Sequence, residues 1–310
     1  MISELLTINV IVGILSSGIR LATPYLYAAI GETFGQRSGV LNLGVDGIML
    51  LGAFAAFYVV YTQQNPVLGL LAAMIVGGVM GLLMAFISVT LQAEQGISGI
   101  GIYLFGLGMS DLLFQKLIGS VETVTGFTQL SIPILSDIPI IGDIFFSHNI
   151  LVYGAYLLVP VAWFVMNKTT IGLKIRAVGE NPEAADSLGV SVAAVRYFTV
   201  TLGGVLSGVA GASLSIALLN VFQQNLTAGL GFIAVALVYF GGWRPFGVLF
   251  GALIFSLVNA LQVWVQVLGI PIPSDLAVMM PYVLTIVVLV LTVQRVRAPA
   301  ALTKAYERGD

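Results

Sequence analysis

The chain has 310 residues, of which 58% are hydrophobic and only 8% are charged, and its formal net charge is -2 at pH 7. Soluble domains carry roughly 25% charged residues, so this composition excludes a soluble globular protein and predicts an all-α, polytopic membrane protein. The near-neutral charge argues against a nucleic-acid partner. The sequence has no cysteine and one histidine, so it excludes disulfides and thiolate metal sites, and we expect no metal or cofactor in this chain.

Nine segments are apolar enough to be candidate membrane spans, and a complete span needs about 20 residues. The first contains Arg20 and Thr23-Pro24, so we expect it to be kinked or broken. The seventh is short, which is typical of a half-helix. The nine segments cover residues 5–30, 39–62, 67–92, 97–117, 149–167, 193–218, 228–242, 246–268 and 276–294.

Lysine and arginine are distributed unequally between the two sides of this predicted bundle. Loops rich in these residues face the cytoplasm in membrane proteins. This rule places the N-terminus outside and the C-terminus in the cytoplasm, with Lys116 at an outer span end. The residues on the cytoplasmic side are Arg37, Lys168, Lys174, Arg176, Arg196, Arg244, Arg295, Arg297, Lys304 and Arg308.

We expect residues 1–310 to form a single transmembrane domain with two conspicuous outer loops. Residues 118–148 form the longer one, and the spacing of Pro, Gly and Asp predicts turns with a short amphipathic piece at the membrane surface. Residues 220–225 belong to the second. Both could contact an external partner, although loops are usually polar for solvation alone.

Small residues recur every four positions inside two of the spans. Such spacing lets helix backbones approach closely, so we interpret these residues as packing positions. No sequence of the form G-x-x-x-x-G-K-[ST] occurs, so the chain has no phosphate-binding loop of that type. The small residues are Gly203, Ser207, Gly211 and Ser215 in one span, and Gly77, Gly81 and Ala85 in the other.

A polar stretch, residues 168–192, separates two strongly apolar segments on the predicted cytoplasmic side. Asn181 and Pro182 are typical of a helix start, as cap and first helical residue. Glu183 and Asp186 lie in the first turn, where carboxylates favour the helix dipole, and Gly189 is placed to end the helix. The pattern fits a short helix that docks into another protein and fits a solvated connector equally well.

An enzymatic role has one weak signal. Gly96, Ser98 and Gly99 match the G-x-S-G of rhomboid-type serine proteases, and His148 lies downstream. The predicted topology places Ser98 and His148 on opposite sides of the membrane, whereas a catalytic pair must lie within hydrogen-bond reach. We therefore expect no catalytic residues in this chain.

Polar side chains inside spans are costly and often functional. Asn42 and Asp46 are four apart and so share a helical face, and Asn259, Gln262 and Gln266 form a stripe along the eighth span. These five are our candidates for a translocation pathway for an uncharged polar solute. Interhelical hydrogen bonding is the alternative for all of them, and for Asp46 it is favoured, with Arg37 or Arg244 as a possible partner.

Several passages, taken in order, resemble one protein family across roughly residues 18 to 290. The chain is similar to permease subunits of ABC importers in the branched-chain amino acid, ribose and nucleoside group, and its N-L-G-V-D-G-I-M-L passage is closest to the nucleoside (BMP-type, "simple sugar") branch. The passages are residues 21–24, 28–32 and 37–53, then Gln95 with Ser98 and Gly99, then residues 172–173, 176–182, 184–185 and 231–237.

The resemblance implies a specific set of roles and partners. The helix over about residues 180–189 becomes the coupling helix that docks on a separate ATPase subunit, which would bind ATP and magnesium. The implied partners are a second permease, which would be a different but related chain, and an extracellular lipid-anchored binding protein. The implied coupling residues are Gly179, Glu180, Asn181, Pro182, Glu183, Ala184, Ala185, Asp186 and Gly189.

Two alternatives remain from the residues alone. A related importer could carry a ribose-like sugar or a branched-chain amino acid. An ion-coupled secondary transporter would need intramembrane carboxylates, for which Asp46 and Asp111 are the nearest candidates.

Overall fold

The computed structural model describes residues 7–133, 135–269, 297–307 and scattered positions between 273 and 290. In this part of the chain the helices are α2 (Ile8–Arg37), α3 (Val45–Gln63), α4 (Pro66–Ala85), α5 (Gln95–Leu117), α6 (Ile141–Phe145), α7 (Ile150–Lys168), α8 (Thr170–Glu180), α9 (Pro182–Ser187), α10 (Val192–Ser213), α11 (Leu230–Phe240) and α12 (Pro245–Val267). Two π-helical turns, η1 (Phe86–Thr90) and η2 (Leu214–Leu218), extend α4 and α10.

Seven of these described helices are long and apolar enough to cross a membrane, and α11, with 11 residues, is shorter. The seventh predicted segment is thus confirmed as a short helix. The first was expected to be kinked or broken. It is not broken, because α2 runs through Pro24 without interruption over 30 residues, and the kink stays a prediction. The ninth predicted segment, 276–294, lies outside the described residues apart from single positions.

Helices α3 and α10 form the centre of the bundle, together with the second half of α2. In the most apolar window of α3 and of α10, 72% of residues are buried, against 28% in α5. The buried part of α2 runs from Gly18 to Gln36. These three helices therefore position the interior, whereas α5 presents most of its surface outward, as a lipid-facing helix would.

Of the predicted small residues, Gly81 and Gly211 lie at close helix contacts, and glycines outside the predicted stripes make further ones. A Cβ on Gly204 of α10 would come within 2.6 Å of the Gly81 Cα of α4. A Cβ on Gly52 of α3 would lie 2.7 Å from the Gly208 Cα of α10. Because any side chain at these points would collide with a neighbouring backbone, glycine is what permits α10 to lie against both α3 and α4.

The prediction of an all-α chain needs one correction. The strands β1 (Gln129–Ser131) and β2 (Ser147–Asn149) pair antiparallel, with Leu130 opposite His148. The short helix α6 lies between them, in the loop where a short amphipathic piece was expected. A further bridge joins Thr123 to Val221, so the two predicted outer loops are in contact.

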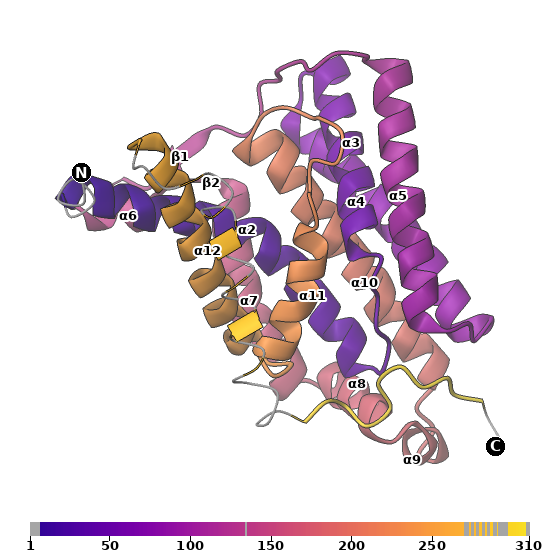
Figure 1. Cartoon of the computed structure of the whole chain (residues 1–310). Coiled ribbons are helices and arrows are strands. Elements are labelled where there is room, and N and C mark those ends of the chain that lie inside the picture. The colour runs from indigo at the N-terminus through magenta and orange to yellow at the C-terminus, as the bar shows by residue number, and fades with distance from the viewer. Residues whose placement is uncertain are drawn as a thin grey trace.

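The two ends of the bundle are different in character (Figure 1). The strands and α6 gather at one end, beside the start of α2, whereas α8, α9 and the C-terminal segment 297–307 gather at the opposite end. Arg37, the last residue of α2, also belongs to that second end, because a Cβ on Gly179 of α8 would collide with its carbonyl oxygen.

Candidate coupling and translocation sites

The local sequence accounts for the form of α9. Asn181 is the N-cap, and its side-chain oxygen accepts a hydrogen bond from the Ala184 amide at 3.0 Å, while Pro182 occupies the first turn. Gly189 follows the helix with φ +82°, and its amide donates to the Asp186 carbonyl at 2.8 Å. The predicted start and end of this helix are therefore confirmed.

One face of α9 packs against neighbouring helices, and the other face is exposed. Ala185 is buried against Val178 at the end of α8 and Val192 at the start of α10. On the other side Leu188 is 84% exposed. An apolar side chain so exposed on a polar, capped helix is suited to insertion into a pocket of another protein.

The eight other predicted coupling residues also divide into a buried or partly buried group and an exposed group. Gly179 is buried, and a Cβ there would collide with the Arg37 carbonyl oxygen, so the end of α8 touches the end of α2. Pro182 and Asp186 are partly buried. The exposed residues are Glu180, Asn181, Glu183, Ala184 and Gly189.

The C-terminal segment 297–307 lies across this junction. The Ala301 amide donates to the Gly179 carbonyl at 2.9 Å, and the Thr303 amide donates to the Gly39 carbonyl at 3.1 Å. Arg196 of α10 is 2% exposed and donates from Nε to the Ser38 carbonyl and from Nη1 to the Lys304 carbonyl. Backbone and side-chain bonds thus connect α8, α10 and the turn after α2.

A buried polar network holds that turn. Glu32 is 3% exposed, and its Oε1 accepts from Gln36 Nε2 at 3.0 Å and from the Asn42 amide at 2.9 Å. Gln36 in turn accepts from the Trp243 indole at 2.7 Å. Asn42 Oδ1 accepts from the Gly44 amide. Each of these groups is buried and bonded, which is what a rigid interior site requires.

Asp46 has a structural position. It is fully buried in the first turn of α3, and its carboxylate accepts from Thr227 Oγ1 at 2.9 Å and from the Gly231 amide at 2.7 Å. Its partners in the described chain are therefore the loop before α11 and the start of that helix, not Arg37 or Arg244. Arg37 Nε instead donates to the Trp243 carbonyl.

The proposed common face of Asn42 and Asp46 is wrong, because α3 begins at Val45 and Asn42 lies in the preceding turn. Asn259, Gln262 and Gln266 do lie along α12, where the first two are partly buried and Gln266 is exposed. A pathway role for these five residues stays a prediction.

The serine-protease alternative finds no support in the geometry. Ser98 Oγ donates to the Glu94 carbonyl at the start of α5. His148 lies in β2, and its Nε2 pairs with the Ile144 carbonyl at 2.7 Å. Burial lowers the pKa of His148, and the nearby Arg20 adds to that effect. The two residues thus have separate local partners at different ends of the bundle.

Sequence reasoning missed three residues that build this region. They are Glu32, Trp243 and Arg196, and no local sequence pattern marks the last two. A signal existed for Glu32, because a carboxylate near the end of an apolar span needs partners. Trp243, with φ +54°, and Arg196 depend on contacts with distant segments.

Comparison with known proteins assigns the chain to a family. The family described as "Branched-chain amino acid transport system / permease component" matches residues 14–289. The chain belongs to that family. It is therefore a multi-pass membrane permease component of ABC transport, as the resemblance implied, rather than an enzyme.

Curated relatives within this permease family match nearly the whole chain. The putative glucose ABC transporter permease protein TsgC13 of Haloferax volcanii is 38% identical over 96% of this chain and 98% of its own. The guanosine ABC transporter permease protein NupQ of Bacillus subtilis is 36% identical over 93% and 94%. The nucleoside ABC transporter permease protein NupC of Lactococcus lactis is 36% identical over 95% and 96%.

Relatives of this permease also occur in pairs. Bacillus subtilis has a second matching permease, NupP, at 27% identity, and Lactococcus lactis has NupB at 26%. No solved structure matches the chain.

Proposed function

We propose that this chain is one permease subunit of an ABC importer that carries nucleosides across the cytoplasmic membrane. The observation that carries the proposal is the match, over more than nine-tenths of the chain, to two permeases named for guanosine and nucleosides. The N-L-G-V-D-G-I-M-L passage supports the same branch. In this reading the Asp46 carboxylate of that passage secures the start of α11 instead of binding solute.

The orientation follows from the basic residues. Arg37, Arg176 and Arg244 gather at the end of the bundle that holds α8 and α9. The positive-inside rule makes that end cytoplasmic. The β1–β2 pair and the loop 118–148 are then extracellular, where an extracellular lipid-anchored binding protein would deliver solute.

The ATPase would act on α9. Its exposed residues, with Leu188 outermost, would enter a groove on a separate subunit that binds ATP and magnesium. Movement of α9 would reach α8 and α10, which flank it in the chain, and through α8 it would reach the span α7. It would also reach the end of α2, because Gly179 lies directly on the Arg37 carbonyl and the segment 297–307 bonds to both sides of that contact.

The second permease would be a related but different chain. The paired relatives of two organisms support this arrangement. A cavity between two permeases would explain why the polar stripe on α12 is not enclosed within a single chain.

The test is uptake of labelled adenosine by cells that hold the complete transporter, with and without this subunit. Unlabelled uridine, ribose, glucose and leucine are the competitors. We expect uptake that depends on this subunit and on ATP and that is blocked by uridine alone. Uptake that survives ATP depletion but collapses with an ionophore would instead indicate a secondary transporter.

A sugar importer is the second candidate function, because the glucose permease relative is 38% identical over almost its full length. Competition by ribose or glucose, without competition by uridine, would assign the chain to that branch. Competition by leucine alone would assign it to amino acid transport.

A further inference from the structure

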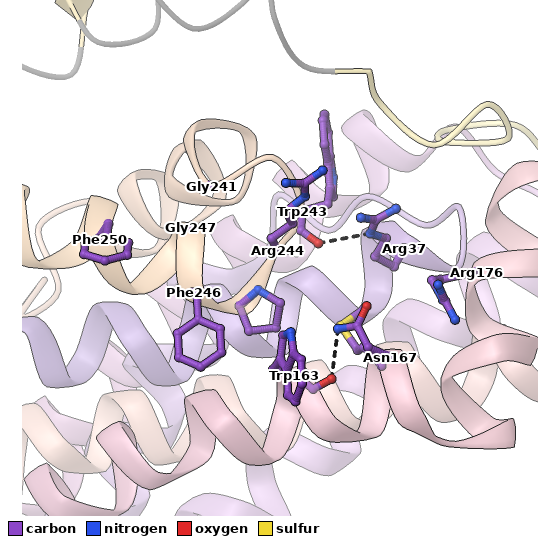
Figure 2. Close-up of a pocket in the computed structure, with 12 residues that line it drawn as sticks. Arg37, Trp163, Asn167, Arg176, Gly241, Trp243, Arg244, Phe246, Gly247 and Phe250 are labelled. Atoms are coloured by element: carbon purple, nitrogen blue, oxygen red, sulfur yellow. Dashed lines mark hydrogen bonds between the residues drawn. The ribbon is translucent and has the colours of Figure 1, made fainter.

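A second site lies outside the coupling and pathway regions, at the ends of α7 and α12. It is a cavity of about 680 Å³, within the range of roughly 300–1,000 Å³ that is usual for small-molecule sites. Its walls come from the last turns of α7, the start of α12, the end of α2 and α8. Figure 2 shows the guanidinium groups of Arg37, Arg244 and Arg176 along one part of the cavity and the rings of Trp163 and Phe246 along another.

The charge in this cavity is strongly positive. Arg37 lies within electrostatic range of Arg176 and Arg244, which repel it, and of Glu180, which attracts it. In the described part of the chain the side-chain hydrogen bonds of these arginines go to carbonyls, from Arg37 Nε to Trp243 and from Arg176 Nε to Gly172, and none forms an ion pair. Three arginines with one nearby carboxylate leave an excess of positive charge that an anion would neutralise.

Two further features add to the positive electrostatic potential of the cavity. Lys168 lies over the Trp163 ring, with its Nζ 5.9 Å from the ring centroid. In the described part of the chain no side chain caps the N-terminus of α12, whose first residues Pro245, Phe246 and Gly247 line the cavity, so the positive end of its dipole is available to a ligand there. Arginine suits a phosphate in particular, because its planar fork can bind two oxygens at once.

The apolar wall of the cavity favours a phosphate that belongs to a lipid over a soluble phosphate. Phe246 is 41% exposed and Phe250 is 64% exposed, one turn apart on α12, and Trp163 of α7 is 38% exposed. Both helices are candidate membrane spans. Aromatic rings in this position lie at the level of lipid headgroups, with the next turn of α12 among the acyl chains. A soluble anion would have no contact with that apolar stripe.

We propose that this cavity binds the headgroup of an anionic phospholipid of the cytoplasmic leaflet. The phosphate would bind between Arg37, Arg176 and Arg244, and an acyl chain would lie along Phe246 and Phe250. Basic pockets between transmembrane helices on the cytoplasmic side recognise such headgroups. The site is independent of which solute is transported.

The experiment uses the assembled transporter, purified in detergent and depleted of lipid. Native mass spectrometry measures retention of dioleoyl phosphatidylglycerol and of dioleoyl phosphatidylcholine, which have the same acyl chains. The variant is Arg176→Gln with Arg244→Gln. The control is Lys174→Gln with Lys304→Gln, which removes the same charge from exposed residues at the same end of the bundle, outside the cavity lining.

One basic residue near an anionic leaflet corresponds to about a fivefold change in affinity, so the variant should bind phosphatidylglycerol on the order of 30-fold more weakly. The control should retain wild-type binding. Arg244→Gln alone, at an exposed position, should give about a fivefold loss if the double variant does not assemble.

Three results would overturn the proposal. The first is equal retention of the two lipids by the wild type. The second is an equal loss of phosphatidylglycerol in variant and control. The third is complete displacement of phosphatidylglycerol by millimolar inorganic phosphate, which would make the site one for a soluble anion. Covering of the cavity by the second permease would appear as the first result.

Discussion

The Asp46 carboxylate at the start of α3 accepts a hydrogen bond of 2.7 Å from the amide of Gly231 at the start of α11, 185 positions later in the chain. Its second oxygen accepts from Thr227 in the loop before that helix. Gly229, the N-cap of α11, offers no side chain of its own. Asp46 therefore serves as the cap that α11 lacks, from a different helix.

Replacement of Asp46 should show how much this cap contributes to the free energy of unfolding. Asp46→Ala leaves the Gly231 amide and the Thr227 hydroxyl buried without their acceptor, so we expect a loss of roughly 1–3 kcal/mol in the free energy of unfolding. Asp46→Asn keeps one oxygen acceptor and should lose less. Denaturant unfolding of the purified transporter provides the measurement, with Asp143→Ala in the exposed loop as control. Equal stability of Asp46→Ala and wild type would contradict the capping role.

The contact between α4 and α10 should not tolerate a larger residue. Gly204→Ala places a methyl group against the Gly81 backbone, so overpacking should cost about 1–3 kcal/mol of stability. Gly108→Ala in α5 has open space around its Cβ and should be neutral or slightly stabilising. Thermal unfolding of both variants in the same detergent compares them directly. A similar midpoint for both would show that the helices can separate at no cost.

The exposed Leu188 should matter for transport without mattering for folding. Leu188→Glu introduces a charge where we propose an apolar pocket of the ATPase, so solute-stimulated ATP hydrolysis and uptake should fall at least tenfold. The thermal midpoint of the permease should stay unchanged because the side chain is 84% exposed. Lys174→Glu, at an exposed position of α8 outside the proposed docking residues, is the control. Normal uptake by Leu188→Glu would contradict the proposed role of α9 in coupling.

The single histidine gives a prediction about pH. Burial lowers the pKa of His148 below its ordinary value of 6.5, and its Nδ1 is buried without a hydrogen-bond partner. Between the lowered pKa and 6.5 the unfolded chain binds more protons than the folded chain, so stability falls as pH drops through that window. His148→Asn should reduce this loss between pH 7 and pH 5. An unchanged pH profile would mean that other groups cause it.

Local patterns in the sequence were enough for several elements of this protein. The cap and end of α9, from Asn181 to Gly189, follow from residues within two turns of one another. The spans and the small-residue stripes at Gly81 and Gly211 follow from periodicity, which depends only on the helix itself. The family resemblance used the same stretches and agreed with the family that matches residues 14–289.

The long-range hydrogen-bond partners of buried side chains could not be predicted from local patterns. The expected arginine partners of Asp46 are wrong, because its carboxylate accepts from the Gly231 amide. No local pattern predicts the bond from the Trp243 indole to Gln36. A buried polar group requires a partner, but its sequence does not say which one, because the partner is chosen by how distant helices pack.

The sequence by itself therefore determined a multi-pass helical permease with a short, capped helix that starts at Pro182. Hydrophobicity and capping are properties of consecutive residues, and they act before any tertiary contact exists. The tertiary structure alone decided that α9 is connected to α2 through Gly179 and the segment 297–307, and that three arginines from α2, α8 and the start of α12 surround one cavity. Both depend on long-range packing, which brings together groups that no local period relates.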